Sequence, residues 1–213
     1  ARENSIRAYI RHFPAYPLPD TSKGIYHSFR YGNAEIFVCD DRSDRSPDLE
    51  CFVPDSSGLL DFVPPAGHSI LGQAQMNWLI NGLKSSTARW KFIVSGVAFN
   101  KGYQAALNYS LNPLVQNLPI PGTGMTGKTF AASIVDTWAG FPADQQRLSD
   151  ECTDNNITNV IFLTSDSHTS AIDDGANAGF PEIMAGNLSH SNSHLAQIMY
   201  GLGINPWNAG GQG

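Results

Sequence analysis

NVIFLTS, at residues 159–165, is a short apolar run rich in β-branched residues and bounded by polar turn residues, which predicts a buried strand. Two similar runs lie upstream, EIFVCD at 35–40 and KFIVSGVAF at 91–99. All three runs are apolar on both faces, which is typical of strands in a sheet that other layers cover. They therefore predict three internal strands of one sheet.

Helical patterns precede two of these strands. LGQAQMNWLINGLKSS has apolar residues near helical spacing and predicts a helix over 72–85. PADQQRLSDECTDNN begins with Pro142, which suits a first helical turn, and predicts a helix over 143–154. Two helix-then-strand units imply parallel strands, so we expect a single α/β domain over residues 1–213.

The remaining segments carry weaker patterns. Residues 52–68 and 100–135 are rich in Gly, Pro and Asn, which favours long surface loops. The last stretch, NPWNAGGQG at 205–213, contains no strand or helix pattern. The first residues contain neither a leading methionine nor an apolar leader, so we expect a processed chain or a piece of a longer protein.

Net charge, the length of the apolar runs and the absence of certain motifs argue against several classes of function. The net charge of −6 argues against a nucleic-acid-binding surface, which is normally basic. No apolar run reaches the roughly 18 residues of a membrane span. No Gly-x-Ser-x-Gly elbow, phosphate-binding loop or Rossmann fingerprint occurs, which disfavours serine hydrolases, NTPases and dinucleotide enzymes.

Polar residues follow each of the three predicted strands. Because the carboxyl ends of parallel strands meet at one edge, where ligands bind in open α/β sheets, we expect a site there. The residues are Asp40, Asp41 and Arg42 after the first strand, Ser95 and Asn100 after the second, and Asp166 and His168 after the third.

Asp166 and His168 are the first candidates for metal ligands. In extended backbone, residues two apart project to the same face, so a carboxylate and an imidazole would approach one ion. Oxygen suits a hard cation and neutral imidazole a transition metal. The alternative is a structural turn with a hydrogen-bonded histidine. Two ligands are also fewer than the roughly four to eight donors of a metal site.

Other residues allow two interpretations each. Arg42 and Arg45, in DDRSDR, would clamp a phosphate, or would form an arginine–aspartate network that only holds the loop. Asp136, in DTWAGF, is either a site residue or a former of a helical first turn. His190 and His194 have the spacing of zinc ligands on a helix, but the serines between them favour a loop.

The three cysteines show no metal-ligand spacing. Cys39 lies inside an apolar run and is expected to pack as a small apolar residue. Cys51 and Cys152 are candidates for a disulfide, but the sequence alone does not establish that they pair.

Longer stretches resemble, in order, the C-terminal half of PhoD-like alkaline phosphatases. They are IYHSFRYGNAEIFVCDDRSDRS, SILGQAQMNWLINGLKSSTARWKFIVSGVAFN, DTWAGFPADQQRLSDECTDNNITNVIFLTSDSHTS and GFPEIMAG, and the resemblance covers about residues 1–187. The family's LDTRSYR is here CDDRSDR, its GDVHSS is SDSHTS, and its WDGYPAERQRL is WAGFPADQQRL.

The resemblance implies a function. It implies a layered α/β/β/α metallophosphoesterase sandwich that hydrolyses phosphate mono- and diesters and is secreted, periplasmic or extracellular. It makes Asp166 a ligand of a calcium-type metal and His168 a ligand of an iron-type metal. In a two-metal site of this kind, Arg42 would contact the phosphate and Asp136 would assist at the same edge.

This sequence also departs from the family pattern. Ser165 replaces the glycine before the aspartate, Ala139 stands where an aspartate is common, and Gln145 where an arginine is common. The family's DDHE segment and other early ligands precede an NS-x-RAY stretch, and here ENSIRAY stands at residues 3–9. We therefore expect a partner in the N-terminal half of the same protein, and without it one open sheet face. The alternative function is a noncatalytic extracellular structural or binding domain.

Overall fold

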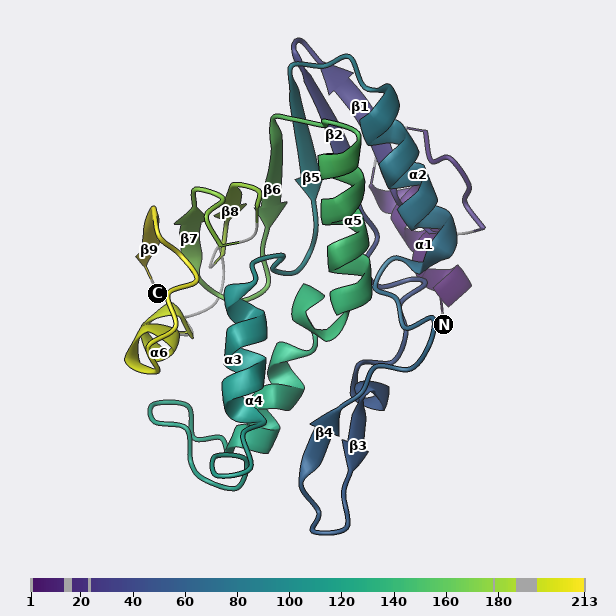
Figure 1. The fold of residues 1–213 in the computed structure, drawn as a ribbon. Helices are drawn as coiled ribbons and strands as arrows, with labels where there is room; N and C mark the ends of the chain where they lie inside the picture. Colours follow the sequence, from purple (N-terminus) through teal and green to yellow (C-terminus); the bar gives the residue numbers. More distant parts are fainter. Residues whose placement is uncertain (1, 14–16, 23, 178, 187–194, 213) are drawn as a thin grey trace.

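The computed structural model describes residues 2–13, 17–22, 24–177, 179–186 and 195–212 (Figure 1). Its main feature is a seven-stranded mixed sheet in the order β1-β2-β5-β6-β8-β7-β9. The strands are β1 (His27–Tyr31), β2 (Ala34–Val38), β5 (Trp90–Val94), β6 (Val160–Thr164), β7 (Ser170–Asp173), β8 (Glu182–Met184) and β9 (Gly210–Gln212).

The three predicted strands form the interior of this sheet. They are β2, β5 and β6, which are adjacent and parallel, and β8 continues the parallel part. Phe37 pairs with Ile93, and Ile93 pairs with Phe162, so the three strands present the same face in register. The predicted α/β fold is therefore confirmed, with antiparallel strands added at both sides.

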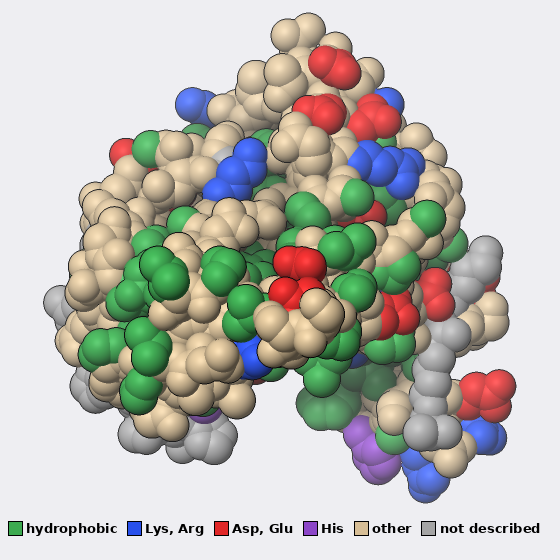
Figure 2. Space-filling view, turned by 60° about the horizontal axis from the view of Figure 1, so that its bottom comes forward, with side chains coloured by type: hydrophobic (Ala, Val, Ile, Leu, Met, Phe, Trp, Pro, Cys, Tyr) green, Lys and Arg blue, Asp and Glu red, His purple; other side chains and the backbone are tan. Residues whose placement is uncertain are grey.

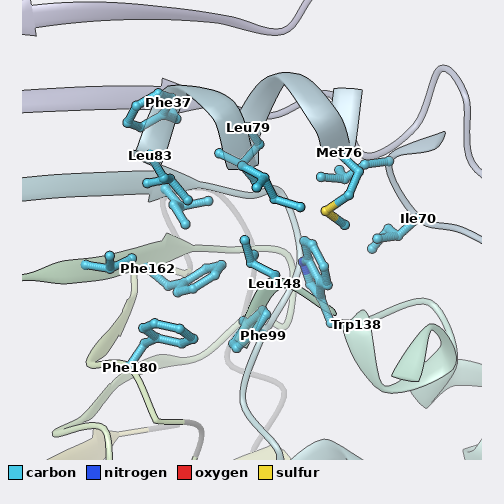
Figure 3. Packing of buried hydrophobic residues seen from close by; sticks show 14 of the residues in the cluster. Phe37, Ile70, Met76, Leu79, Leu83, Phe99, Trp138, Leu148, Phe162 and Phe180 are labelled. Carbon is cyan, nitrogen blue, oxygen red and sulfur yellow. The ribbon is translucent and has the colours of Figure 1, made fainter. Parts of the chain in front are cut away.

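Two helices cover one face of the sheet. They are α2 (Gly72–Ser85) and α5 (Pro142–Asp154), the two predicted helices, and they lie side by side in front of the central strands (Figure 1). The apolar residues of α2, spaced three and four apart, and Leu148 of α5 meet the buried side chains of the strands (Figure 3). Phe162 is fully buried there, with its ring 4.0 Å from that of Phe99.

The opposite face of the sheet carries apolar side chains that are only partly buried. Register places Val38, Val94, Leu163, Ile183 and Ile172 in one row across five strands. The first three are half-buried, and Ile183 and Ile172 are 41% and 45% exposed. The apolar strands predicted layers on both faces, with one face open where the N-terminal half is absent; among the described residues only the α2–α5 face is fully covered.

A second helical layer lies beyond the carboxyl ends of β5 and β6. It contains α3 (Gly102–Ser110) and α4 (Gly127–Ile134), towards which the arrowheads of these strands point (Figure 1). The prediction of a loop over 100–135 is therefore wrong. In α3 the buried residues recur at helical spacing, and Thr126 begins α4 with a capping box to Thr129. Only the Gly-, Pro- and Asn-rich residues between them form turns.

Other boundaries also differ from the prediction. Residues 52–68 contain the hairpin β3 (Phe52–Pro54) and β4 (Leu60–Phe62), preceded by the short 3₁₀ helix η1 (Asp48–Cys51). The strand predicted over 91–99 ends at Val94. Val97, Ala98 and Phe99 continue the apolar run because they pack into the core beyond the end of the strand, which explains why the sequence pattern extended too far.

The two ends of the chain also form regular structure. They contain α1 (Arg2–His12), α6 (Leu195–Gly201) and β9, although no closing strand or helix was expected after residue 204. A second 3₁₀ helix, η2 (Trp138–Gly140), leads into α5.

We expect Phe162→Ala to destabilise the protein by about 3–5 kcal/mol, because it empties space at the centre of the α2–α5 core. Urea denaturation monitored by circular dichroism measures this free energy of unfolding. Leu114→Ala is the control, since that side chain is 82% exposed. Equal losses in both variants would contradict the placement of the core.

Candidate functional site

The residues at the strand ends have two different roles, because some support the loops from inside and others are exposed at the candidate site. Asp40 and Asp41 are buried, and their oxygens accept backbone N–H groups. Asp40 accepts from Ile25 and Ser43, each at 2.9 Å, and Asp41 accepts from Gly96 at 2.7 Å. These two carboxylates therefore shape the loops after β2 and β5.

Asn100 has a comparable structural role. Its side chain is fully buried, accepts from the backbone of Gly102 at 2.7 Å and donates to the carbonyl of Pro206 at 2.5 Å. The polar strand ends that were predicted as a site are thus partly internal supports of the loops.

Arg42 lies in a network with carboxylates. Its guanidinium donates to both oxygens of Asp136, at 2.5 and 3.2 Å, and reaches Asp166 at 3.4 Å. The hydrogen bond to Asp136 is the main reason that the pKa of Arg42 is raised above its ordinary value. The side chain is 52% exposed, so a charged guanidinium is presented at the surface of the sheet edge.

Asp136 is held from its other side by Arg45. The Arg45 side chain is only 5% exposed, contacts Asp136 at 2.8 Å and Asp48 through its Nε at 2.6 Å, and lies over the ring of Phe141. Buried charges are normally paired in this way. Asp136 therefore joins a buried arginine to a half-exposed one, and the arginine–aspartate network that the sequence left open is present.

Asp166 and His168 lie on the turn that follows β6. Both have left-handed backbone, with φ of 74° and 51°, although the sequence reasoning assumed extended backbone. Left-handed φ costs a non-glycine residue about 1–2 kcal/mol, and such residues cluster at functional sites. The two side chains are exposed, and both line one cavity of about 440 Å³ together with Asp136.

A glycine lets this turn pack closely on the sheet. At Gly186, the last residue of GFPEIMAG, a Cβ atom would lie 2.4 Å from the backbone oxygen of Thr169. Thr169 is fully buried directly after His168. The turn thus rests on the end of β8, and any larger residue at position 186 would displace it.

Two cavities meet at this edge. A cleft of about 860 Å³ lies between α1 and the strand ends, and Arg42, Ser95, Gly96 and Ser165 contribute to its walls. The 440 Å³ cavity lies beyond Asp166. Arg42 lines the first cavity and its partners Asp136 and Asp166 line the second, so these contacts lie between the two cavities.

The donors fit metals in type but not in number. Asp166 offers carboxylate oxygen and His168 imidazole nitrogen, which suit a hard cation and a transition metal. Among the described residues, no group of three or more His, Cys, Asp or Glu side chains converges. A metal ion at this place would need further donors from outside the described residues, because structural and catalytic sites have at least three or four protein ligands.

Comparison with known proteins identifies the family. A sequence model described as PhoD-like phosphatase matches residues 1–198. The chain belongs to the PhoD-like phosphatase family. It is 29% identical over 182 residues to alkaline phosphatase D of Bacillus subtilis (strain 168), an alignment covering 79% of this chain and 26% of that protein.

The fold of this PhoD-like phosphatase chain is also found in a solved structure. The structure, titled "Structure of PhoD", matches with a TM-score of 0.63 and 23% identity, over 99% of this chain and 39% of that chain. At this identity the likeness shows the fold. The chain spans well under half the length of both relatives.

The three departures from the PhoD-like pattern are all accommodated locally. Ser165 donates to the carbonyl of Gly96 at 3.2 Å, Ala139 is buried, and Gln145 is buried and donates to the carbonyl of Phe99. Gln145 thus supports the loop after β5 from within the core, and neither Ala139 nor Gln145 lines the cavity at Asp166.

Several other predicted residues are placed away from this site. Cys39, Cys51 and Cys152 are all free, so the pairing of the last two that the sequence left open is not formed in this structure. His190 and His194 lie outside the described residues. No helix in the described part of the chain is long and apolar enough to cross a membrane.

Sequence reasoning missed Glu182 in this PhoD-like chain. It is fully buried on β8, and its Oε1 accepts from the hydroxyl of Thr164 at 2.6 Å and from the backbone of Phe99 at 3.1 Å. Its Oε2 has no hydrogen-bond partner. Burial raises the pKa of Glu182 to about 7. The glutamate joins the end of β6, two residues before Asp166, to the loop after β5.

We expect the stability of the protein to depend on pH through Glu182. With its pKa raised from 4.5 to about 7, the folded protein keeps a proton that the unfolded chain loses between these values. Stability therefore falls as pH rises across this window. Glu182→Gln cannot ionise, so at pH 8 it should be more stable than wild type by on the order of 2 kcal/mol, and near pH 4 the difference should vanish.

Urea denaturation of both proteins at pH 4, 6 and 8 measures this difference. Glu3→Gln, on the exposed surface of α1, is the control for loss of a carboxylate. Parallel pH profiles for wild type and Glu182→Gln would show that folding does not raise the pKa of Glu182.

Proposed function

We propose that the protein hydrolyses phosphate mono- and diesters at the carboxyl edge of its sheet. The observation that carries this proposal is the convergence of Arg42, Asp136 and Asp166 beside His168, in a chain of the PhoD-like phosphatase family. The whole-protein activity is part of the proposal, because the chain spans 26% of the curated relative.

Arg42 is proposed to bind the phosphoryl oxygens. Its planar guanidinium forms paired hydrogen bonds with oxyanions, and here it is charged, half-exposed and held by Asp136. Asp136 is a positioning residue in this scheme. Because Arg45 fixes Asp136 from the buried side, little conformational freedom has to be lost when Arg42 meets a phosphate.

Asp166 and His168 are proposed to hold a calcium-type and an iron-type metal, as the family resemblance implies. When bound, such a pair neutralises phosphate charge and lowers the pKa of the attacking water. The left-handed turn presents both side chains to one cavity without using either in the core. No third His, Cys, Asp or Glu of the described residues converges with them, so we propose that the remaining ligands come from another part of the protein.

The partly exposed sheet face supports the same proposal. Val38, Val94 and Leu163 form a continuous apolar row that two exposed isoleucines extend. Apolar surface of this kind marks an interaction site. We propose that the N-terminal half of the same protein covers it and brings the missing ligands. Secretion to the periplasm or the cell exterior is proposed from the resemblance alone.

A second function is favoured by one observation. No described group of three potential ligands converges, so the chain by itself would be a noncatalytic structural or binding domain with the same fold. Intact mass and metal analysis of the native protein distinguish the two. Two metal ions per protein support the enzyme, and a metal-free protein supports the noncatalytic domain.

In the complete protein, we expect His168→Ala to reduce hydrolysis of 4-nitrophenyl phosphate by at least roughly 100-fold, more than outer-shell partners of a metal typically cost. Metal content should fall with it. The free energy of unfolding of the metal-free protein should remain close to wild type, since the exposed ring contributes little to the core. Asp166→Asn should act in the same direction but less completely, because its amide oxygen still coordinates weakly.

Asp61→Asn is the matched control for Asp166→Asn, since Asp61 is exposed on the distant hairpin β3–β4. Full activity and unchanged metal content in His168→Ala would refute the assignment of this histidine.

A further inference from the structure

The cavity of about 440 Å³ beside Asp166 has a mainly apolar wall. Its volume lies within the range of small-molecule sites, about 300–1,000 Å³. The apolar residues come from α3, α4, α6 and the turn between α3 and α4, and they are Tyr103, Met125, Phe130, Ile134, Leu195 and Ile198. Tyr103, Phe130 and Ile134 are buried and belong to the second core, so this part of the wall is fixed.

The ionisable side chains that line the cavity lie at its end near the proposed phosphate position, and they are Asp136, Asp166 and His168 together with the tyrosine Tyr103. Its acidic lining residues are Asp136 and Asp166, and no lysine or arginine is among its described lining residues. Both carboxylates contact Arg42, which lines the other cleft. Away from the metal positions proposed at Asp166 and His168, an anionic group inside the cavity would therefore meet apolar side chains, with no lysine or arginine of the described lining to pair with it.

The cavity lies next to the place proposed for the phosphate. A phosphoryl group on Arg42 would lie beside Asp166, and an ester has its leaving oxygen on that same group. The rest of the leaving alcohol then has the apolar cavity beside it. Figure 2 shows the molecule with the bottom of Figure 1 turned forward, and hydrophobic side chains gather there on the side where the segment between α3 and α4 lies. Leu114, Leu118 and Met125 of that segment are exposed.

We propose that this cavity binds the leaving alcohol of the phosphate ester and selects uncharged aromatic or bulky alkyl alcohols over anionic ones. The inference rests on the proposed phosphoesterase function and adds the substrate class. Apolar surface of the alcohol would replace water against Phe130, Ile134 and Ile198, at about 25 cal/mol for each Å² removed from water. An added carboxylate or phosphate on the alcohol would lose its hydration against these apolar side chains without gaining a lysine or arginine partner.

Three aryl phosphates whose phenols differ little in acidity test the proposal in the complete protein. They are phenyl phosphate, 2-naphthyl phosphate and 4-carboxyphenyl phosphate. We expect kcat/KM to be roughly tenfold higher for the naphthyl than for the phenyl ester, because an additional ring is buried. The carboxyphenyl ester should be several-fold poorer than the phenyl ester.

A variant with an added cation provides the second readout. Ser133 is exposed at the cavity wall on α4, and Ser133→Arg should raise the ratio of kcat/KM for carboxyphenyl to phenyl phosphate by roughly fivefold, as expected for a new partly exposed ion pair. Asn108→Arg is the matched control, because Asn108 is exposed on α3 and does not line the cavity. It should leave this ratio unchanged.

The outcomes separate the two proposals. Hydrolysis of all three esters at equal kcat/KM, with a ratio unchanged in Ser133→Arg, would overturn the leaving-group site and leave the phosphoesterase standing. The same shift in Asn108→Arg as in Ser133→Arg would also overturn the site, because it would report only net charge. Failure to hydrolyse any of the esters would overturn the proposed function and this inference with it.

Discussion

The carboxylate of Asp136 lies between two guanidinium groups, and the arrangement of the candidate site depends on this contact. Arg45 is nearly buried, so its charge requires a close partner, and Asp136 and Asp48 supply it. Oδ1 of Asp136 contacts both guanidinium groups, and Oδ2 accepts a second hydrogen bond from Arg42, so the aspartate holds Arg42 at the surface. The loop after β2 is thereby tied to the segment before η2, and Arg42 is directed to the turn of Asp166.

The core beneath the site connects this network to the sheet. Trp138 is fully buried after Asp136, and its indole donates to Ser95 at 3.1 Å, whose hydroxyl donates to Asp41 at 2.9 Å. Glu182 makes a parallel connection from Phe99 to Thr164. The ends of β2, β5 and β6 are therefore joined by buried polar contacts, which hold the exposed groups in place more firmly than loops alone would.

The central strands, helix α5 and the edge of the sheet that carries the site could be predicted from short-range periodicity and from the residues at the strand ends. NVIFLTS, KFIVS and EIFV became adjacent parallel strands, and Pro142 begins α5 as expected. The site edge followed from strand direction, and Arg42, Asp136 and Asp166 do meet there. The roles of Asp166 and His168 remain predictions, because their ligation depends on donors that the described residues do not include.

Other features could not be read from one sequence. Helix α3 was hidden because Gly, Asn and Pro surround a short helix whose buried face appears only when Tyr103 and Leu107 meet α4. Glu182 stands in a three-residue strand, and only long-range contact with Phe99 shows that it is buried. The left-handed turn at Asp166 likewise depends on packing against Gly186.

The most direct test of the central claim is a crystal structure of the complete protein with orthovanadate, a phosphate analogue, using anomalous scattering to locate metals. The account predicts metal ions bound by Asp166 and His168 and the oxyanion within hydrogen-bonding distance of Arg42. An oxyanion bound elsewhere, with Asp166 and His168 free of metal and Arg42 contacting only its carboxylates, would contradict it.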